Sequence, residues 1–140
     1  MKRDRMKVVL QVREDTERRR LAEQVAADLS LRLASECHGD AVVALDGRTS
    51  PSGVRNTEGL RQHRLGTLAL SDAVERARER ERLARREAEE AEQRRVEAAI
   101  ARRSAERLAE RRAAEVAVQA TRAADSQLDA VALETWRRRA

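Results

Sequence analysis

The sequence predicts an all-α protein, an antiparallel two-helix coiled-coil hairpin with a Gly- and Pro-containing tip. Three observations carry this prediction. The 140 residues include 26 alanines and 28 arginines, a composition typical of long helices. Phe and Tyr are absent and Trp occurs once, so the chain lacks the bulk of a globular core. The only proline, Pro51, lies with Gly47 and Gly53 in one short segment, which divides the chain in two.

The first helix is expected over residues 4–45, where Gly39 is the only breaker. Its apolar residues recur at steps of three and four, the spacing of one face of a helix. We expect this stripe to face the second helix; its members are Met6, Val9, Val12, Thr16, Ala22, Val25, Leu29 and Leu33.

The tip is expected over residues 46–71, as a loop followed by a short helix. The loop follows from Gly47, Pro51 and Gly53, because glycine permits unusual backbone angles and proline lacks an N–H. A short helical stretch, 60–70, is interrupted by Gly66. Ser71 and Asp72 with Glu75 form a plausible capping box at the start of the next helix.

The second helix is expected over residues 72–138, because no Gly or Pro follows Ser71. We expect a thin alanine stripe at Ala77, Ala84, Ala88, Ala91 and Ala98. Larger residues thicken this stripe toward the C-terminus: Val96, Ile100, Leu108, Val116, Ala120, Ala124, Leu128 and Val131.

The middle of this helix, residues 76–95, is nearly all charge plus alanine, and it either stands alone in solvent or awaits a partner. Four Glu–Arg pairs at helical spacing support it at about 0.2–0.5 kcal/mol each: Glu75–Arg78, Glu79–Arg82, Glu81–Arg85 and Glu90–Arg94.

The charge distribution argues against a nucleic-acid partner, although the isoelectric point is near 10.7. Basic against acidic residues number nine to eight over 1–45, four to two over 46–71 and 17 to 15 over 72–140. Interleaved Glu would repel phosphates, and Trp136 is the only aromatic residue that could stack on a base. The basic run after Trp136 is better explained as a complement to the helix dipole.

No pattern for catalysis, a cofactor or a metal is present, so we expect a non-enzymatic protein. Cys37 and His38 have no second ligand at suitable spacing, and His63 has no nucleophile near it in sequence. The five glycines match no phosphate-binding loop. The first 14 residues hold no apolar run long enough for a signal peptide or a membrane span, and a lone cysteine suits a reducing compartment.

Three segments resemble the FliJ family, the coiled-coil stalk proteins of the bacterial flagellar type III export apparatus. The first is the basic, then apolar, then Arg-Glu opening: Lys2, Arg3, Arg5, Met6, Val9, Leu10, Arg13 and Glu14. The second is Gln62-His63-Arg64 after the loop. The third is the C-terminal run of Glu106, Leu108, Glu110, Arg111 and Arg112, followed by Leu128, Asp129 and Ala132.

The resemblance implies a non-enzymatic stalk on the cytoplasmic face of the membrane at the flagellar base. It would bind the hexameric export ATPase, the cytoplasmic domain of the export gate and export chaperones, with no cofactor, no nucleic acid and no transmembrane segment. The implied ATPase contacts are Val9, Leu10, Arg13, Glu14, Arg111, Arg112, Leu128 and Asp129. The implied gate contacts are Leu60, His63, Arg64, Leu65 and Leu68.

Three alternatives stay open at this point. The first is the equivalent stalk of a virulence-type III secretion system, and the second is a helical nucleic-acid-associated protein. The third, an accessory stalk subunit of an ATP synthase, is disfavoured because no membrane anchor is visible in the sequence.

Overall fold

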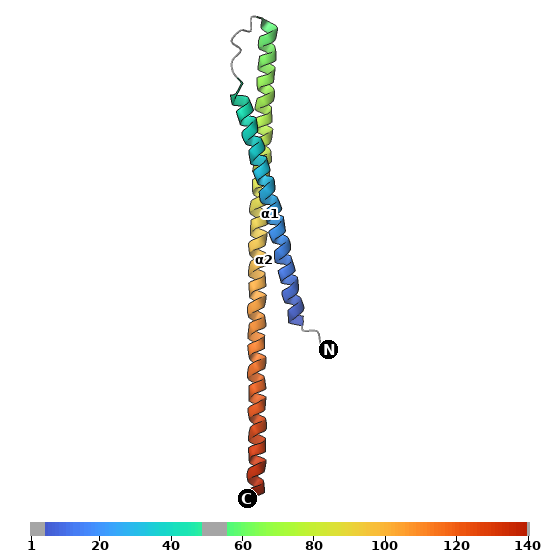
Figure 1. Cartoon of the computed structure of the whole chain (residues 1–140), viewed down its shortest axis with the longest axis vertical. Coiled ribbons are helices and arrows are strands. Elements are labelled where there is room, and N and C mark those ends of the chain that lie inside the picture. The colour runs from blue at the N-terminus through green and yellow to red at the C-terminus, as the bar shows by residue number, and fades with distance from the viewer. Residues whose placement is uncertain (1–4, 49–55, 140) are drawn as a thin grey trace. The chain divides into compact units, whose positions relative to one another are not determined.

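The structure, a computed structural model, describes residues 5–48 and 56–139 and consists of two long helices. Helix α1 spans Arg5–Asp46 and helix α2 spans Thr57–Arg139 (Figure 1). Neither described range contains a strand. The predicted all-α helical hairpin is therefore confirmed, while the predicted loop residues Pro51 and Gly53 lie outside the described residues.

Helix α2 begins earlier than the sequence predicts, so the separate short helix within 46–71 is wrong. The backbone N–H of Gly59 donates to Oδ1 of Asn56 at 2.9 Å, which caps the first turn. From there the helix runs without a break through Gly66, Ser71 and Asp72, which excludes the predicted capping box. A single glycine costs a helix only about 1 kcal/mol relative to alanine, and an 83-residue helix tolerates that cost.

The described residues form two compact units, which are treated separately below. The hairpin unit comprises Thr16–Ala98, and the terminal unit comprises Met1–Asp15 with Ala99–Ala140. No helix in the described ranges is long and apolar enough to cross a membrane.

In the hairpin unit the two helices pack antiparallel along an alanine seam on α2. Its buried members are Ala77, Ala84, Ala88, Ala91 and Ala98, which confirms the predicted alanine stripe. His38 contacts Glu81, whereas the later residue Arg48 contacts the earlier residue His63, so the chain directions oppose. The charged stretch 76–95 is therefore paired with α1, and three of its four predicted Glu–Arg pairs form.

The face that α1 turns toward this seam differs from the predicted apolar stripe. The half-buried residues recur with heptad spacing and include Gln24, Ala27, Leu31, Ala34, His38, Ala41 and Leu45. Val25, Leu29 and Leu33, which the sequence analysis assigned to the contact, are instead exposed.

A physical reason for this difference is the small size of alanine. A seam of alanines is filled best when the backbones approach closely, and that favours small residues on the facing helix. The His38–Glu81 contact sets a register in which Ala34 lies level with Ala84, and Ala41 with Ala77, to within about one residue. Bulky residues at those levels would hold the helices apart.

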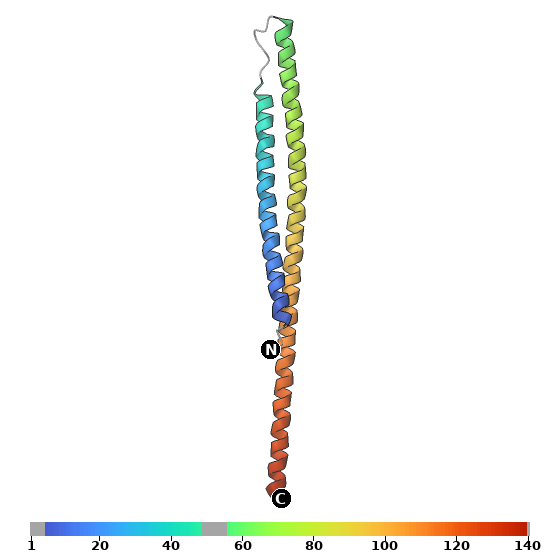
Figure 2. The ribbon, with the colours of Figure 1, turned by 90° about the vertical axis from the view of Figure 1, so that its right-hand side faces the viewer.

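In the terminal unit the first turns of α1 pack on a short part of α2. Met6 and Leu10 are half-buried, as is Ala109 of α2, and Ala105 is buried. Val9 and Val12 are exposed, contrary to the predicted stripe. The last turns of α2, drawn in red in Figure 2, are exposed at every described residue.

The C-terminal part of α2 is solvent-exposed at every residue from Arg111 to Arg139. The predicted thickening of the seam is therefore wrong, since all of its larger members are exposed: Val96, Ile100, Leu108, Val116, Leu128 and Val131. Val96 and Ile100 each lie two residues from the buried Ala98, about 160° around the helix from it, so they point away from the seam.

Candidate functional site

All eight residues implied to contact an ATPase lie in the terminal unit. The structure brings two of them together, since Leu10 of α1 and Arg112 of α2 line the same shallow hollow. Met6, Ala109 and Val116 complete its apolar part. The guanidinium of Arg112 lies 3.7 Å from the sulfur of Met6, at the rim of the hollow.

The other implied ATPase contacts are dispersed over the surface of this unit. Val9, Arg13 and Glu14 are exposed on α1, and Arg111 is exposed on α2. Leu128 and Asp129 lie 16 or 17 residues beyond Arg112, about 24 Å farther along α2. The structure therefore presents two separate surfaces, one beside Leu10 and Arg112 and one around Leu128.

The surface around Leu128 combines apolar and basic side chains on one exposed helix, here called the C-terminal segment (residues 117–139). Its large apolar side chains are about half exposed or more: Val118, Leu128, Val131, Leu133 and Trp136. Arg137, Arg138 and Arg139 occupy its last turn, where Arg138 pairs with Glu134 at 3.4 Å. Exposed apolar surface of this kind is typical of a protein that acts by binding.

The residues implied to contact an export gate occupy the first three turns of α2. Leu60, Leu65 and Leu68 are more than half exposed, and Arg64 is also exposed. His63 is half-buried, and its backbone carbonyl accepts hydrogen bonds from Arg48 at 3.1 Å and from Thr67 at 3.0 Å. This end of α2 is thus an apolar surface with one histidine at its edge.

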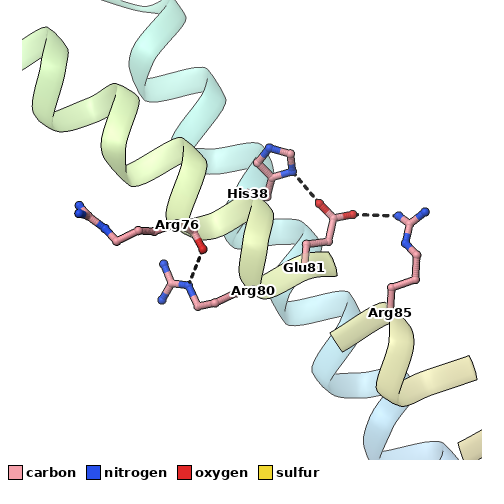
Figure 3. Close-up of polar contacts among 5 residues, drawn as sticks. All are labelled: His38, Arg76, Arg80, Glu81 and Arg85. Carbon is pink, nitrogen blue, oxygen red and sulfur yellow. Dashed lines mark hydrogen bonds and ion pairs between the residues drawn. The ribbon is translucent and has the colours of Figure 1, made fainter. Parts of the chain in front are cut away.

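A polar cluster inside the hairpin unit joins the predicted Glu81–Arg85 pair to His38 of α1, a contact that was not predicted from the sequence (Figure 3). Nδ1 of His38 lies 2.6 Å from Oε2 of Glu81, and the other carboxylate oxygen accepts a hydrogen bond from Arg85 at 3.1 Å. A neutral imidazole with its proton on Nδ1 and a protonated imidazole can both donate this bond. Nearby, Nε of Arg80 donates to the backbone carbonyl of Arg76 at 3.3 Å.

The carboxylate of Glu81 is held in its ionised form by these partners. The hydrogen bond with His38, and after it the one from Arg85, lower the pKa of Glu81 against the opposing effect of desolvation. The signal in the sequence was the heptad position: Glu81 interrupts the alanine seam between Ala77 and Ala84. A histidine seven residues from both Leu31 and Leu45 is its counterpart on α1.

The described residues offer no site for metal chemistry. No group of three or more His, Cys, Asp or Glu side chains in these ranges could hold a metal ion. Cys37 is an exposed free thiol within α1.

Comparison with known proteins adds no relative to this description. No protein-family model matches the chain, and no curated protein or solved structure is significantly similar to it.

Proposed function

We propose that this chain is a non-enzymatic stalk of the FliJ type, which binds the hexameric ATPase of a bacterial flagellar export apparatus. The observation that carries the proposal is the C-terminal segment, a helix with exposed apolar side chains and no described partner. The resemblance in the first and last segments of the sequence supplies the identity of the partner.

The shape and charge of this segment suit the centre of a protein ring. A single α-helix with side chains is about 10–12 Å across, so it is slender enough to enter a central hole. The ring would cover the apolar residues of this segment, and Arg111 and Arg112, which precede the segment on α2, would meet acidic side chains on the ATPase.

The first turns of α2 are proposed to contact the export gate. Leu60, Leu65 and Leu68 are the exposed apolar residues there, and Arg64 adds a positive charge. The same proposal includes binding of export chaperones and a location on the cytoplasmic face of the membrane at the flagellar base.

The test is binding of the chain to the flagellar export ATPase, measured by calorimetry and by the fraction of ATPase that assembles into hexamers. The variant Arg111→Glu/Arg112→Glu should weaken binding while leaving helicity unchanged, because both side chains are exposed. The control Arg76→Glu/Arg86→Glu makes the same charge change on exposed residues of the hairpin unit and should bind normally. Normal binding by the first variant would remove these arginines from the contact.

A further inference from the structure

A shallow hollow in the terminal unit, here called the terminal hollow, lies between the first turns of α1 and residues 109–116 of α2. Its volume is about 590 Å³, which falls in the range of about 300–1,000 Å³ that is typical of ligand pockets. Its floor is apolar and consists of Met6, Leu10, Ala109, Ala113 and Val116. Val116 is 65% exposed and Ala113 is also exposed, so this floor is open to solvent.

Three cations line the terminal hollow beside this apolar floor. They are Arg5, Lys7 and Arg112, and none of the described residues that line the hollow is acidic. Arg112 contacts the sulfur of Met6 at 3.7 Å rather than a carboxylate. Within the described ranges no ion pair neutralises Arg5 or Lys7. A carboxylate that entered the hollow would therefore meet positive charge without a competing acid in contact.

The position of two of these cations on α1 strengthens the preference for an acid. Arg5 and Lys7 stand in the first turn of α1, where the helix dipole is positive, and this turn contains no acidic residue. Cations are unfavourable at this end of a helix and carboxylates are favourable. An acidic group from another molecule would thus compensate charges that the first turn of α1 does not compensate itself.

The acidic residues near the terminal hollow limit the size of the anion that fits. Glu14 follows Leu10 by one turn, and Glu110 and Glu115 lie on α2, but none of the three lines the hollow. Asp4 lies outside the described residues. A nucleic acid or an anionic membrane would extend beyond the hollow and be repelled by these carboxylates, whereas a short peptide segment would meet only the cations and the floor.

We propose that the terminal hollow binds an acidic peptide segment of a partner protein. A large apolar side chain of the segment lies on the floor beside Leu10 and Val116, where its burial supplies affinity. Carboxylates on either side of it pair with Arg5, Lys7 and Arg112, which selects against basic sequences.

This inference deepens the proposed function and rests on it for the identity of the partner, which is the export ATPase. Leu10 and Arg112 belong to both contacts, and the hollow adds Arg5, Met6 and Lys7. The chemistry of the hollow is tested with a peptide and without the ATPase, so the failure of one proposal can be told from the failure of the other.

The first test measures binding of a labelled peptide, Gly-Asp-Glu-Leu-Leu-Glu-Asp-Gly, to the full chain by fluorescence anisotropy. We expect binding that weakens as the salt concentration rises. Two control peptides should bind at least about tenfold more weakly, one with lysine in place of each acidic residue and one with serine in place of both leucines. Equal binding of the three peptides would overturn the proposal, as would binding of the chain to phosphatidylserine vesicles but not to the acidic peptide.

A pair of charge-reversal variants places the peptide in the terminal hollow. Lys7→Glu should weaken binding of the acidic peptide at least about fivefold. Arg107→Glu makes a like change at an exposed residue of the same unit, about 160° around α2 from Ala109, and should bind normally. Equal affinities of the two variants would contradict binding in the hollow.

The second test repeats this comparison with the flagellar export ATPase, measured by calorimetry. Lys7 is not among the ATPase contacts that the resemblance implies, yet Lys7→Glu should weaken ATPase binding, and the acidic peptide should compete with the ATPase for the chain. An ATPase that binds the chain while the peptide does not would overturn this inference and leave the proposed function standing. A peptide that binds the chain while the ATPase does not would support the hollow and overturn the proposed function.

Discussion

The carboxylate of Glu81 joins α1 to α2, because it binds Nδ1 of His38 at 2.6 Å and a guanidinium nitrogen of Arg85 at 3.1 Å. It occupies a seam in which the buried residues of α2 are alanines. Alanines seven residues apart look alike after a shift of one heptad, so a stripe of them fixes the register of two helices only weakly. The His38–Glu81 contact distinguishes the observed register from the registers shifted by one heptad, as single polar residues do in other coiled coils.

Glu81→Gln is expected to destabilise the hairpin unit in a pH-dependent way. The pKa of Glu81 is lowered in the folded state, chiefly by His38, so the ionised carboxylate stabilises the fold. That contribution is complete above the ordinary value of 4.5 and is lost as the pH falls through the lower folded-state pKa. The free energy of unfolding measured in urea should therefore be lower for Glu81→Gln than for the unaltered chain at pH 6. This difference should shrink at progressively lower pH.

The partner of Glu81 can be checked by a double-mutant cycle. In a His38→Ala chain, Glu81→Gln should cost less than it does in the unaltered chain, because the hydrogen bond is already gone. Equal costs in both chains would show that His38 contributes nothing to the effect.

Ala91→Leu is expected to destabilise the chain by about 1–3 kcal/mol through overpacking. Ala91 is only 2% exposed, so a larger side chain there must push α1 away from α2. Gln93→Leu adds an apolar side chain to an exposed position of the same turn and should change stability by less than about 0.5 kcal/mol. Chemical denaturation of both variants measures the difference; equal midpoints would contradict the packed alanine seam.

The helices and the alanine seam were predictable from the sequence, whereas the contact face of α1 was not. Ala77, Ala84, Ala91 and Ala98 recur every seven residues without a competing pattern, so their burial followed from spacing alone. Helix α1 carries two candidate rows, one with Leu31, Ala34 and Ala41 and one with Val25, Leu29 and Leu33.

Hydrophobicity favours the second of these rows, and the structure uses the first, in which Ala34 and Ala41 lie level with Ala84 and Ala77 of the alanine seam. The early start of α2 was not predicted, because Gly59 and Gly66 suggest a loop. The cap at Asn56 and the length of the helix outweigh the low helix propensity of these two glycines. For the implied ATPase and gate contacts, the structure gives exposure and position, and they stay predictions.

Gly39 of α1 and Gly66 of α2 should respond differently to replacement by alanine. At Gly39 an added methyl group meets nothing within 4 Å, so Gly39→Ala should stabilise the chain by about 1 kcal/mol. At Gly66 it would clash with Nη2 of Arg48, which must then move and lose its hydrogen bond to the carbonyl of His63. We expect Gly66→Ala to stabilise less than Gly39→Ala.

Replacing Arg48 by alanine separates the gain in helix propensity at position 66 from the cost of displacing the Arg48 guanidinium. In an Arg48→Ala chain no guanidinium lies against Gly66, so Gly66→Ala should recover the full helix-propensity gain of about 1 kcal/mol. Thermal unfolding of the four chains measures this, and the same gain with and without Arg48 would show that the guanidinium does not lie in that position.

The C-terminal segment should exchange its backbone amides much faster than the hairpin unit. Every residue of 117–139 is exposed, so its helix rests on local hydrogen bonds alone, whereas most helical stability in proteins comes from packing of one face. Residues 77–98 gain protection from the buried alanines. Hydrogen exchange measured by mass spectrometry should show a boundary after the Ala105–Ala109 turn, with peptides from 117–139 losing protection first.

Addition of the export ATPase should then protect these peptides, because the proposed contact covers them. Slow exchange in the free chain would mean that another surface covers the segment, and the proposed contact would then have to displace it.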